Sequence, residues 1–148
     1  FSMKQTRHSF LKFQGYTSIK LNKTDTNHYQ IEAKINDIEG LFILDTGASN
    51  TCTDLQINKF HLISIDSEVK ASSATDLMSE TKVSKKNKLQ IGKWISKSSP
   101  IVLFDMNHIN KALSERDIKT VDGIIGADIL KRGKAIIDYA KSKLYLKL

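Results

Sequence analysis

Apolar and polar residues alternate along many short stretches of the chain, with the period of two that is typical of a half-buried β-strand. The most regular stretch is Tyr29–Ile35, in which every second residue is apolar. The same reading predicts further short strands at 16–21, 68–74, 80–84, 89–91, 94–95, 135–139 and 144–146. Helical spacing is confined to short segments. The pattern therefore predicts a mostly β chain with two or three short helices.

Two uninterrupted apolar runs, Leu41–Leu44 and Ile101–Phe104, depart from this alternation. Strands that are apolar at every position are typical of sheets covered on both faces. Residues 36–40, before the first run, contain the Asn, Asp and Gly of a hairpin turn. We therefore expect a hairpin there, and we expect Pro100 to begin the strand that contains the second run.

Three segments favour short helices. Thr53 or Asp54 is a suitable cap for a helix that extends to about Phe60. Residues 107–116 show helical spacing, and the second half of 121–130 is expected to be a helix that ends before the next glycine.

The length of 148 residues suggests one domain. We expect residues 1–15 to be an N-terminal arm or edge strand and residues 16–148 to form a single domain. An apolar content of 40% and a charged content of 26% are ordinary for a folded domain and exclude a fully disordered chain. No apolar run approaches the roughly 18 residues of a membrane span, so we expect no membrane anchor in this sequence.

The net charge of +7 is compatible with an acidic partner such as nucleic acid. The lysines are spread along the chain, however, and the densest run, Lys82–Lys88, contains no aromatic residue. A solvated hairpin is therefore favoured over a nucleic-acid-binding surface. The single cysteine, Cys52, excludes an internal disulfide and a multi-cysteine metal site. The four histidines show no metal-ligand spacing, so we expect no metal or cofactor.

One short motif can carry chemistry. Asp45-Thr46-Gly47 directly follows the first uninterrupted apolar run. A carboxylate can act as a general acid or base, threonine can donate a hydrogen bond without adding charge, and glycine allows a tight turn beside them. In the second half of the chain, Asp122–Leu130 again combines apolar residues with a Gly-Ala pair.

Together, Leu44–Ser49 and Asp122–Leu130 resemble the retropepsin-like aspartic peptidases, and they are most similar to the single-domain bacterial and retroelement-type members. The resemblance extends from about Tyr29 to Leu146, because the closing hairpin also looks like the ending of this family. It implies a closed β-barrel, the half-lobe of an acid protease. It also implies an endopeptidase that cleaves polypeptide substrates with a water molecule held between two aspartates.

The resemblance assigns catalysis to Asp45, but the chain contains one Asp-Thr-Gly sequence. In the second half, Ile124 stands two residues before the glycine, where the first half has Asp45. A pair of carboxylates therefore requires Asp45 from each of two chains, and we expect a homodimer with the site on its two-fold axis. The resemblance further implies a set of residues that support the catalytic loop: Thr46, Gly47, Ala48, Ile124, Ile125 and Gly126.

The flap that covers the substrate in this family is expected at about Val69–Val83, which contains no glycine. Viral members have glycine-rich flap tips. The residues expected to form the tip and to contact substrate are Thr75, Asp76, Leu77 and Met78. This departure motivates an alternative function, a catalytically weak or inactive peptidase-like module that binds peptides or mediates assembly.

Other reactive side chains favour structural roles. Ser49 is not followed by the second glycine of a nucleophile elbow. Cys52 is expected to be a small buried residue rather than part of a thiol site. Asp122 and Asp128 are expected to cap or turn the chain rather than to catalyse.

Overall fold

The computed structural model describes residues 6–66 and 80–148. Its helices are α1 (Arg7–Phe13), α2 (Asn107–Ser114) and α3 (Ala127–Arg132). Its strands are β1 (Tyr16–Lys20), β2 (Asn22–Lys23), β3 (Tyr29–Ile35), β4 (Ile38–Leu44), β5 (Cys52–Asp54), β6 (Ile65–Asp66), β7 (Thr81–Ile91), β8 (Trp94–Phe104), β9 (Gly123–Ile125), β10 (Ile136–Asp138) and β11 (Lys143–Lys147).

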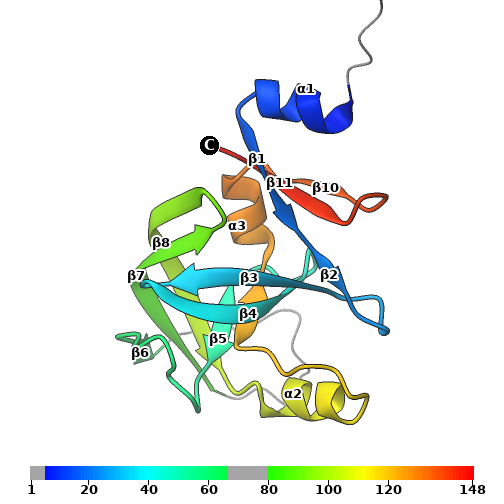
Figure 1. The fold of residues 1–148 in the computed structure, drawn as a ribbon. Helices are drawn as coiled ribbons and strands as arrows, with labels where there is room; N and C mark the ends of the chain where they lie inside the picture. The colour runs from blue at the N-terminus through cyan, green and yellow to red at the C-terminus, as the bar shows by residue number, and fades with distance from the viewer. Residues whose placement is uncertain (1–5, 67–79) are drawn as a thin grey trace, which may run out of the picture.

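Six strands form a closed barrel in the order β3-β4-β9-β5-β8-β7, and the short strands β2 and β6 extend the sheet at its two ends. The ring closes where β7 pairs with β3, at Lys34↔Gln90 and Ile35↔Leu89. In Figure 1 the barrel lies between α2 and α3. The prediction of a mostly β, closed barrel with two or three short helices is therefore confirmed for the described residues.

Tight turns set the strand register. The β3–β4 turn consists of Asn36 and Asp37, whose φ angles are +51° and +68°. Two consecutive residues with positive φ form the two-residue turn whose twist suits antiparallel strands, and Asn and Asp tolerate that conformation better than most residues. Gly92, with φ +57°, lies at the β7–β8 turn. Both hairpins therefore form where the turn residues predict them.

The strand β9 brings the two halves of the chain together. It lies between β4, to which it is parallel, and β5, to which it is antiparallel. Space there is so limited that a Cβ added to Gly123 would lie 2.2 Å from the carbonyl oxygen of Cys52. The inserted strand places Ile125, which belongs to the segment Asp122–Leu130, directly beside Leu44 at the end of β4, where Asp45 follows.

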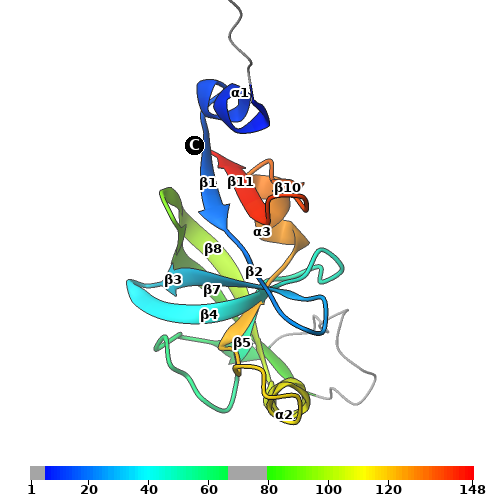
Figure 2. The same cartoon turned by 45° about the vertical axis from the view of Figure 1, so that its right-hand side comes forward.

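A second sheet, in the order β1-β11-β10, joins the two ends of the described chain. The helix α1 packs on this sheet (Figures 1 and 2), where it buries Leu11. An ion pair joins Arg7 to the buried Asp138 at 3.4 Å, and His8 Nδ1 lies 3.0 Å from the hydroxyl of Tyr145. Part of the segment that was expected to be an arm or edge strand is thus helical.

Two apolar clusters occupy opposite faces of the same strands. Phe42 and Leu44 of β4, with Ile125 of β9, belong to the cluster inside the barrel. Ile43 and Ile124 belong to a second cluster, which α2 covers with its one buried leucine. On β8, Ile101 and Leu103 belong to the first cluster, and Val102 and Phe104 belong to the second. Because both faces of β4 and β8 are buried, the two uninterrupted apolar runs of the sequence are explained.

The helix predicted to begin at Thr53 or Asp54 and to extend to about Phe60 does not form. Instead, β5 pairs with β8 and β9, which are distant in sequence. The carboxylate of Asp54 accepts a hydrogen bond from the N–H of Gln56 at 3.0 Å, and the chain turns there. Aspartate side chains stabilise such turns as readily as they cap helices, so tertiary pairing decides between the two outcomes.

Two further expectations concern the flap segment and a membrane anchor. The predicted strand 68–74 and the flap tip lie outside the described residues. Within 6–66 and 80–148, none of the helices combines the length and the apolar character that crossing a bilayer requires.

Candidate active site

Asp45 is the first residue after β4, and its own loop holds its side chain. Its backbone N–H donates to the carbonyl oxygen of Ile125 at 3.0 Å, which continues the β4–β9 ladder by one bond. Its carboxylate accepts the N–H of Gly47 at 2.9 Å, and its carbonyl oxygen accepts the N–H of Ala48 at 3.2 Å. The carboxylate is thereby held by a backbone N–H of its own loop.

The loop around Asp45 is open to solvent on one side. Thr46 and Gly47 are exposed and Asp45 is half-buried, although Leu44 and Ala48 on either side of them are buried. The loop therefore presents a carboxylate, a hydroxyl and a glycine backbone at the surface while its two ends are anchored in apolar packing. Such an arrangement allows the carboxylate to bind water and exchange protons.

The far end of the loop is tied to α3 through a buried threonine that sequence reasoning missed. The hydroxyl of Thr51, which has no exposed surface, donates to a carboxylate oxygen of Asp128 at 2.8 Å. The same hydroxyl accepts the N–H of Gly126 at 3.0 Å. Asp128 is thus an anchor for the loop, in line with a structural rather than a catalytic role. No sequence signal reveals this pair, since its members are 77 residues apart.

Close backbone contact explains the Gly-Ala pair at the start of α3. A Cβ added to Gly126 would lie 2.8 Å from the carbonyl oxygens of both Ala48 and Asn50. The N–H of Ala127 donates to the same oxygen of Ala48 at 2.7 Å. Gly126 and Ala127, at the start of α3, are therefore in direct contact with the loop that follows Asp45.

Cys52 lies at the same corner, where its thiol is buried and hydrogen-bonded. It is 1% exposed, and its thiol donates to the carbonyl oxygen of Asn50 at 3.1 Å. Burial raises the pKa of the Cys52 thiol to about 12, with smaller contributions from the negative charges of Asp128 and Asp45. The thiol therefore stays protonated near neutral pH, and the expectation of a small buried residue is confirmed.

Asp122 does not cap a helix. Its carboxylate accepts the N–H of Leu41 on β4 at 2.9 Å and the ammonium group of Lys59 at 3.1 Å. These three residues also line a groove of about 820 Å³ beside β3 and β4, but Asp45 does not line it. This groove is therefore distinct from the loop around Asp45.

The expected flap residues Thr75, Asp76, Leu77 and Met78 lie outside the described residues. Among the residues that are described, no group of three or more His, Cys, Asp or Glu side chains is arranged to hold a metal ion. The chemistry available around the loop is thus that of carboxylate, hydroxyl and backbone groups.

Comparison with solved structures finds the same fold in several proteases. A retropepsin-like aspartic protease from Rickettsia conorii matches with a TM-score of 0.56 and 19% identity, over 89% of this chain and 89% of that chain. The retroviral protease-like domain of Ddi1 from Leishmania major matches with a TM-score of 0.53 and 16% identity, over 79% and 86% of the two chains. The EIAV protease in complex with the inhibitor HBY-793 matches with a TM-score of 0.53 and 16% identity, over 79% and 98%.

At these identities the structural likeness shows the fold alone. Comparison with curated protein sequences finds no match. A family model described as aspartyl protease, however, matches residues 31–129, which is more than half of the chain and includes both Asp45 and the segment around β9. The chain therefore belongs to the aspartyl protease family and has its retropepsin-like fold.

Proposed function

We propose that the protein is an aspartic endopeptidase that hydrolyses peptide bonds in polypeptide substrates as a homodimer. Family membership supports a peptidase-type function. The observation that carries the finer proposal is the geometry of Asp45, a half-buried carboxylate oriented by Gly47 and joined through its backbone to Ile125. An exposed loop with buried ends is suited to meet a second copy of itself.

Two carboxylates are needed because one must be ionised and the other protonated. In the part of the chain that the structure describes, β9 presents Ile124 and Ile125 beside the end of β4, and neither can ionise. Asp128 is engaged by the hydroxyl of Thr51. The second carboxylate is therefore supplied by Asp45 of a partner subunit, and the two aspartates lie together on the two-fold axis.

The reaction then proceeds by general acid–base catalysis. The ionised Asp45 removes a proton from a water molecule held between the two carboxylates, and the water oxygen attacks the scissile carbonyl carbon. The protonated Asp45 donates its proton to the carbonyl oxygen, which gives a neutral tetrahedral gem-diol. This intermediate collapses when the C–N bond breaks: the aspartate that took the proton from water gives it to the departing nitrogen, and the other aspartate accepts a proton from a hydroxyl group, so that the dyad again carries one proton. No covalent bond to the enzyme forms.

The surrounding residues have supporting roles in this proposal. Thr46 is exposed where it can hydrogen-bond across the two-fold axis, and Gly47 presents backbone groups to substrate. The anchors of the catalytic loop are Ala48, Ile124, Ile125 and Gly126. Thr75, Asp76, Leu77 and Met78 are proposed to cover the bound substrate.

The decisive variant is Asp45→Asn, which keeps the shape of the side chain and removes its acid–base chemistry. We expect cleavage of a peptide substrate to fall at least about 10²–10⁴-fold, the range that general acid–base catalysis provides. Circular dichroism and sedimentation should show an unchanged fold and dimer. Cleavage at the wild-type rate would contradict the mechanism. Binding of a statine-containing peptide without cleavage by the wild type would favour the peptide-binding alternative.

Mixing wild-type and Asp45→Asn chains tests whether both copies supply the aspartate. After subunit exchange at equal concentrations, about a quarter of the dimers contain two wild-type chains. Because mixed dimers lack one carboxylate, activity per wild-type chain should fall to about half. Activity that stays proportional to the amount of wild-type chain would show that a single copy is sufficient.

A further inference from the structure

The strand that supports Asp45, β9, is too short for its own pairing to fix its register against β4. β9 consists of three residues, which pair with β4 as Phe42↔Gly123, Ile43↔Ile124 and Leu44↔Ile125. The next bond of this ladder is the one from Asp45 to β9. A slip of one residue would exchange the two faces of a strand, so the register of β9 determines where Asp45 lies.

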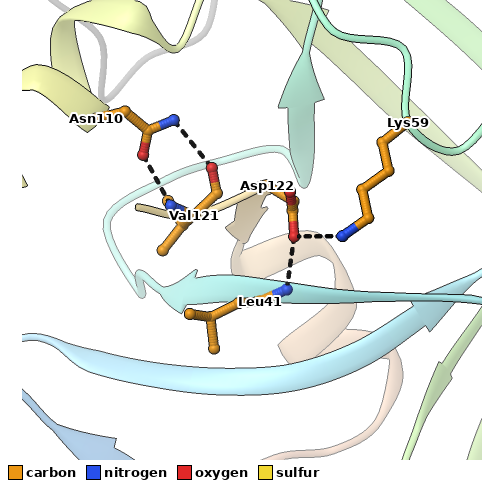
Figure 3. Close-up of polar contacts among 5 residues, drawn as sticks. All are labelled: Leu41, Lys59, Asn110, Val121 and Asp122. Atoms are coloured by element: carbon orange, nitrogen blue, oxygen red, sulfur yellow. Dashed lines mark hydrogen bonds and ion pairs between the residues drawn. The ribbon is translucent and has the colours of Figure 1, made fainter. Parts of the chain in front are cut away.

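At the opposite end of β9, a side chain replaces a main-chain bond. The N–H of Asp122 donates to the carbonyl oxygen of Leu41 at 2.7 Å, and the N–H of Leu41 donates back to the carboxylate of Asp122 at 2.9 Å. In a continued parallel ladder the N–H of Leu41 would bind a main-chain carbonyl group of the neighbouring strand. The Asp122 carboxylate, shown with Leu41 in Figure 3, takes the place of that carbonyl group.

The preceding residue is held by α2 instead of by β4. The side-chain amide of Asn110 donates to the carbonyl oxygen of Val121 at 3.0 Å and accepts the N–H of Val121 at 2.8 Å. Figure 3 shows both bonds side by side. Asn110 thus hydrogen-bonds both the N–H and the carbonyl group of Val121, as a neighbouring strand would. The β4–β9 ladder therefore does not extend past Asp122 toward Val121.

Lys59 contributes less to this arrangement. Its ammonium group lies 3.1 Å from the same carboxylate oxygen of Asp122 that accepts the N–H of Leu41. The side chains of the ion pair are 41% and 30% exposed, and exposed ion pairs contribute little to stability. The hydrogen bond to Leu41, rather than the ion pair, is therefore the contact that locates β9.

We propose that Asn110 and Asp122 are positioning residues that lock the register of β9 against β4 and so hold Asp45 in place. Neither touches the reacting atoms. Their effect on catalysis rests on the proposed peptidase function, whereas their effect on the position of Asp45 does not. Loss of the side-chain hydrogen bonds of either Asn110 or Asp122 should let the start of β9 separate from β4 and weaken the hydrogen bond between Asp45 and Ile125.

The first experiment compares variants of Asp122 by steady-state kinetics. Asp122→Ala removes the acceptor, and we expect kcat to fall about tenfold or more with little change in KM, since small displacements of catalytic groups cost rate rather than binding. Asp122→Asn retains an acceptor oxygen and should stay within about threefold of wild type. Lys59→Met should behave like wild type. The matched control is Lys88→Met, which removes a comparable ion pair, 2.8 Å long, to Asp37.

The second experiment measures amide hydrogen exchange in the full chain by NMR and needs no activity. In Asp122→Ala and Asn110→Ala, the amides of Asp45 and Leu41 should exchange about tenfold faster or more than in wild type and in Lys88→Met. If the alanine variants do not fold, Asn110→Asp carries the test, because it keeps an acceptor for the N–H of Val121 and replaces the donor to the Val121 carbonyl oxygen with a carboxylate oxygen, and it should shift exchange in the same direction.

Two results would overturn the proposal. Unchanged protection of the Asp45 amide in every Asn110 and Asp122 variant would show that these residues do not hold β9. Faster exchange with unaltered kcat would show that the register does not matter for catalysis. A failure of the peptidase function itself would be recognised separately, because Asp45→Asn would then cleave as fast as wild type. The hydrogen-exchange result does not depend on activity and would still test the positions of β9 and Asp45.

Discussion

Two ionisable side chains near the catalytic loop have opposite environments. Asp45 is half-buried and open to water, whereas Cys52 is almost completely buried and hydrogen-bonded to a backbone carbonyl group. The difference follows from strand position, since Cys52 begins β5 in the middle of the sheet and Asp45 follows the end of β4. A carboxylate open to water and a buried thiol of raised pKa therefore lie a few residues apart.

The Cys52 thiol should make the protein less stable in alkali. Its pKa in the folded chain is raised to about 12, so above about pH 9 the unfolded chain releases this proton and the folded chain keeps it. Stability attributable to Cys52 is complete below that pH and is lost as the pH rises toward about 12, by up to about 1.4 kcal/mol per pH unit. Urea unfolding of wild type and Cys52→Ser at several alkaline pH values measures the difference.

Comparing the two proteins isolates Cys52, because Tyr145 is present in both. The pKa of Tyr145 is itself raised, chiefly by desolvation. Wild type and Cys52→Ser should therefore share the general alkaline decline, and wild type should show the steeper one. Parallel curves for the two proteins would show that the thiol ionises as easily in the folded chain as in the unfolded chain.

At the scale of elements, the connection between loop and helix also makes a prediction. Thr51→Val removes a fully buried hydroxyl that serves both Asp128 and the N–H of Gly126. Leaving a buried polar group unpaired costs about 1–3 kcal/mol. We expect this loss in the free energy of unfolding measured with denaturant, together with lower peptidase activity. Thr51→Ser keeps the hydroxyl and should restore most of both, and equal losses in the two variants would contradict this role.

Local patterns predicted most of these elements. The alternation in Tyr29–Ile35 and the turn at Asn36 are properties of neighbouring residues, and the hairpin formed as expected. The helix expected from Thr53 to about Phe60 was wrong, because pairing of β5 with two distant strands outweighed a suitable cap. Pro100 was expected to begin a strand but lies inside β8, where the pairing with β7 is irregular and tolerates a missing N–H.

The candidate site was predictable only in part for the same reason. Asp45 and Gly126 belong to short contiguous motifs, so they could be identified from the sequence. Thr51 and Asp122 act through partners that are 77 and 81 residues away, and Asn110 acts through Val121, which is 11 residues away. No local pattern distinguishes these three residues from ordinary polar residues. Their roles depend on the register of β9, which only the folded chain defines.

At the scale of the whole molecule, the proposed homodimer predicts that activity depends on concentration, because its site would be shared by two copies. Specific activity should rise with protein concentration and level off once dimers predominate. Each copy carries a net charge of +7, so two copies repel each other, and added salt screens this repulsion. We expect the protein concentration that gives half-maximal specific activity to decrease when the salt concentration is raised from about 0.05 M to about 0.5 M. Dilution assays, with sedimentation in parallel, measure this change. A midpoint that rises with salt would indicate attractive charges in the interface instead.

The barrel is closed by a short pairing between β3 and β7, and this has a consequence for solubility. β3 and β7 share two residue pairs, and the turn residue Asn36 reinforces them with bonds to Asn87 and Lys88. If that junction separated, the cylinder would become a curved open sheet with two unprotected edges. Free strand edges are templates for aggregation. A few polar atoms beside one tight turn thus help to keep this protein from forming intermolecular sheets.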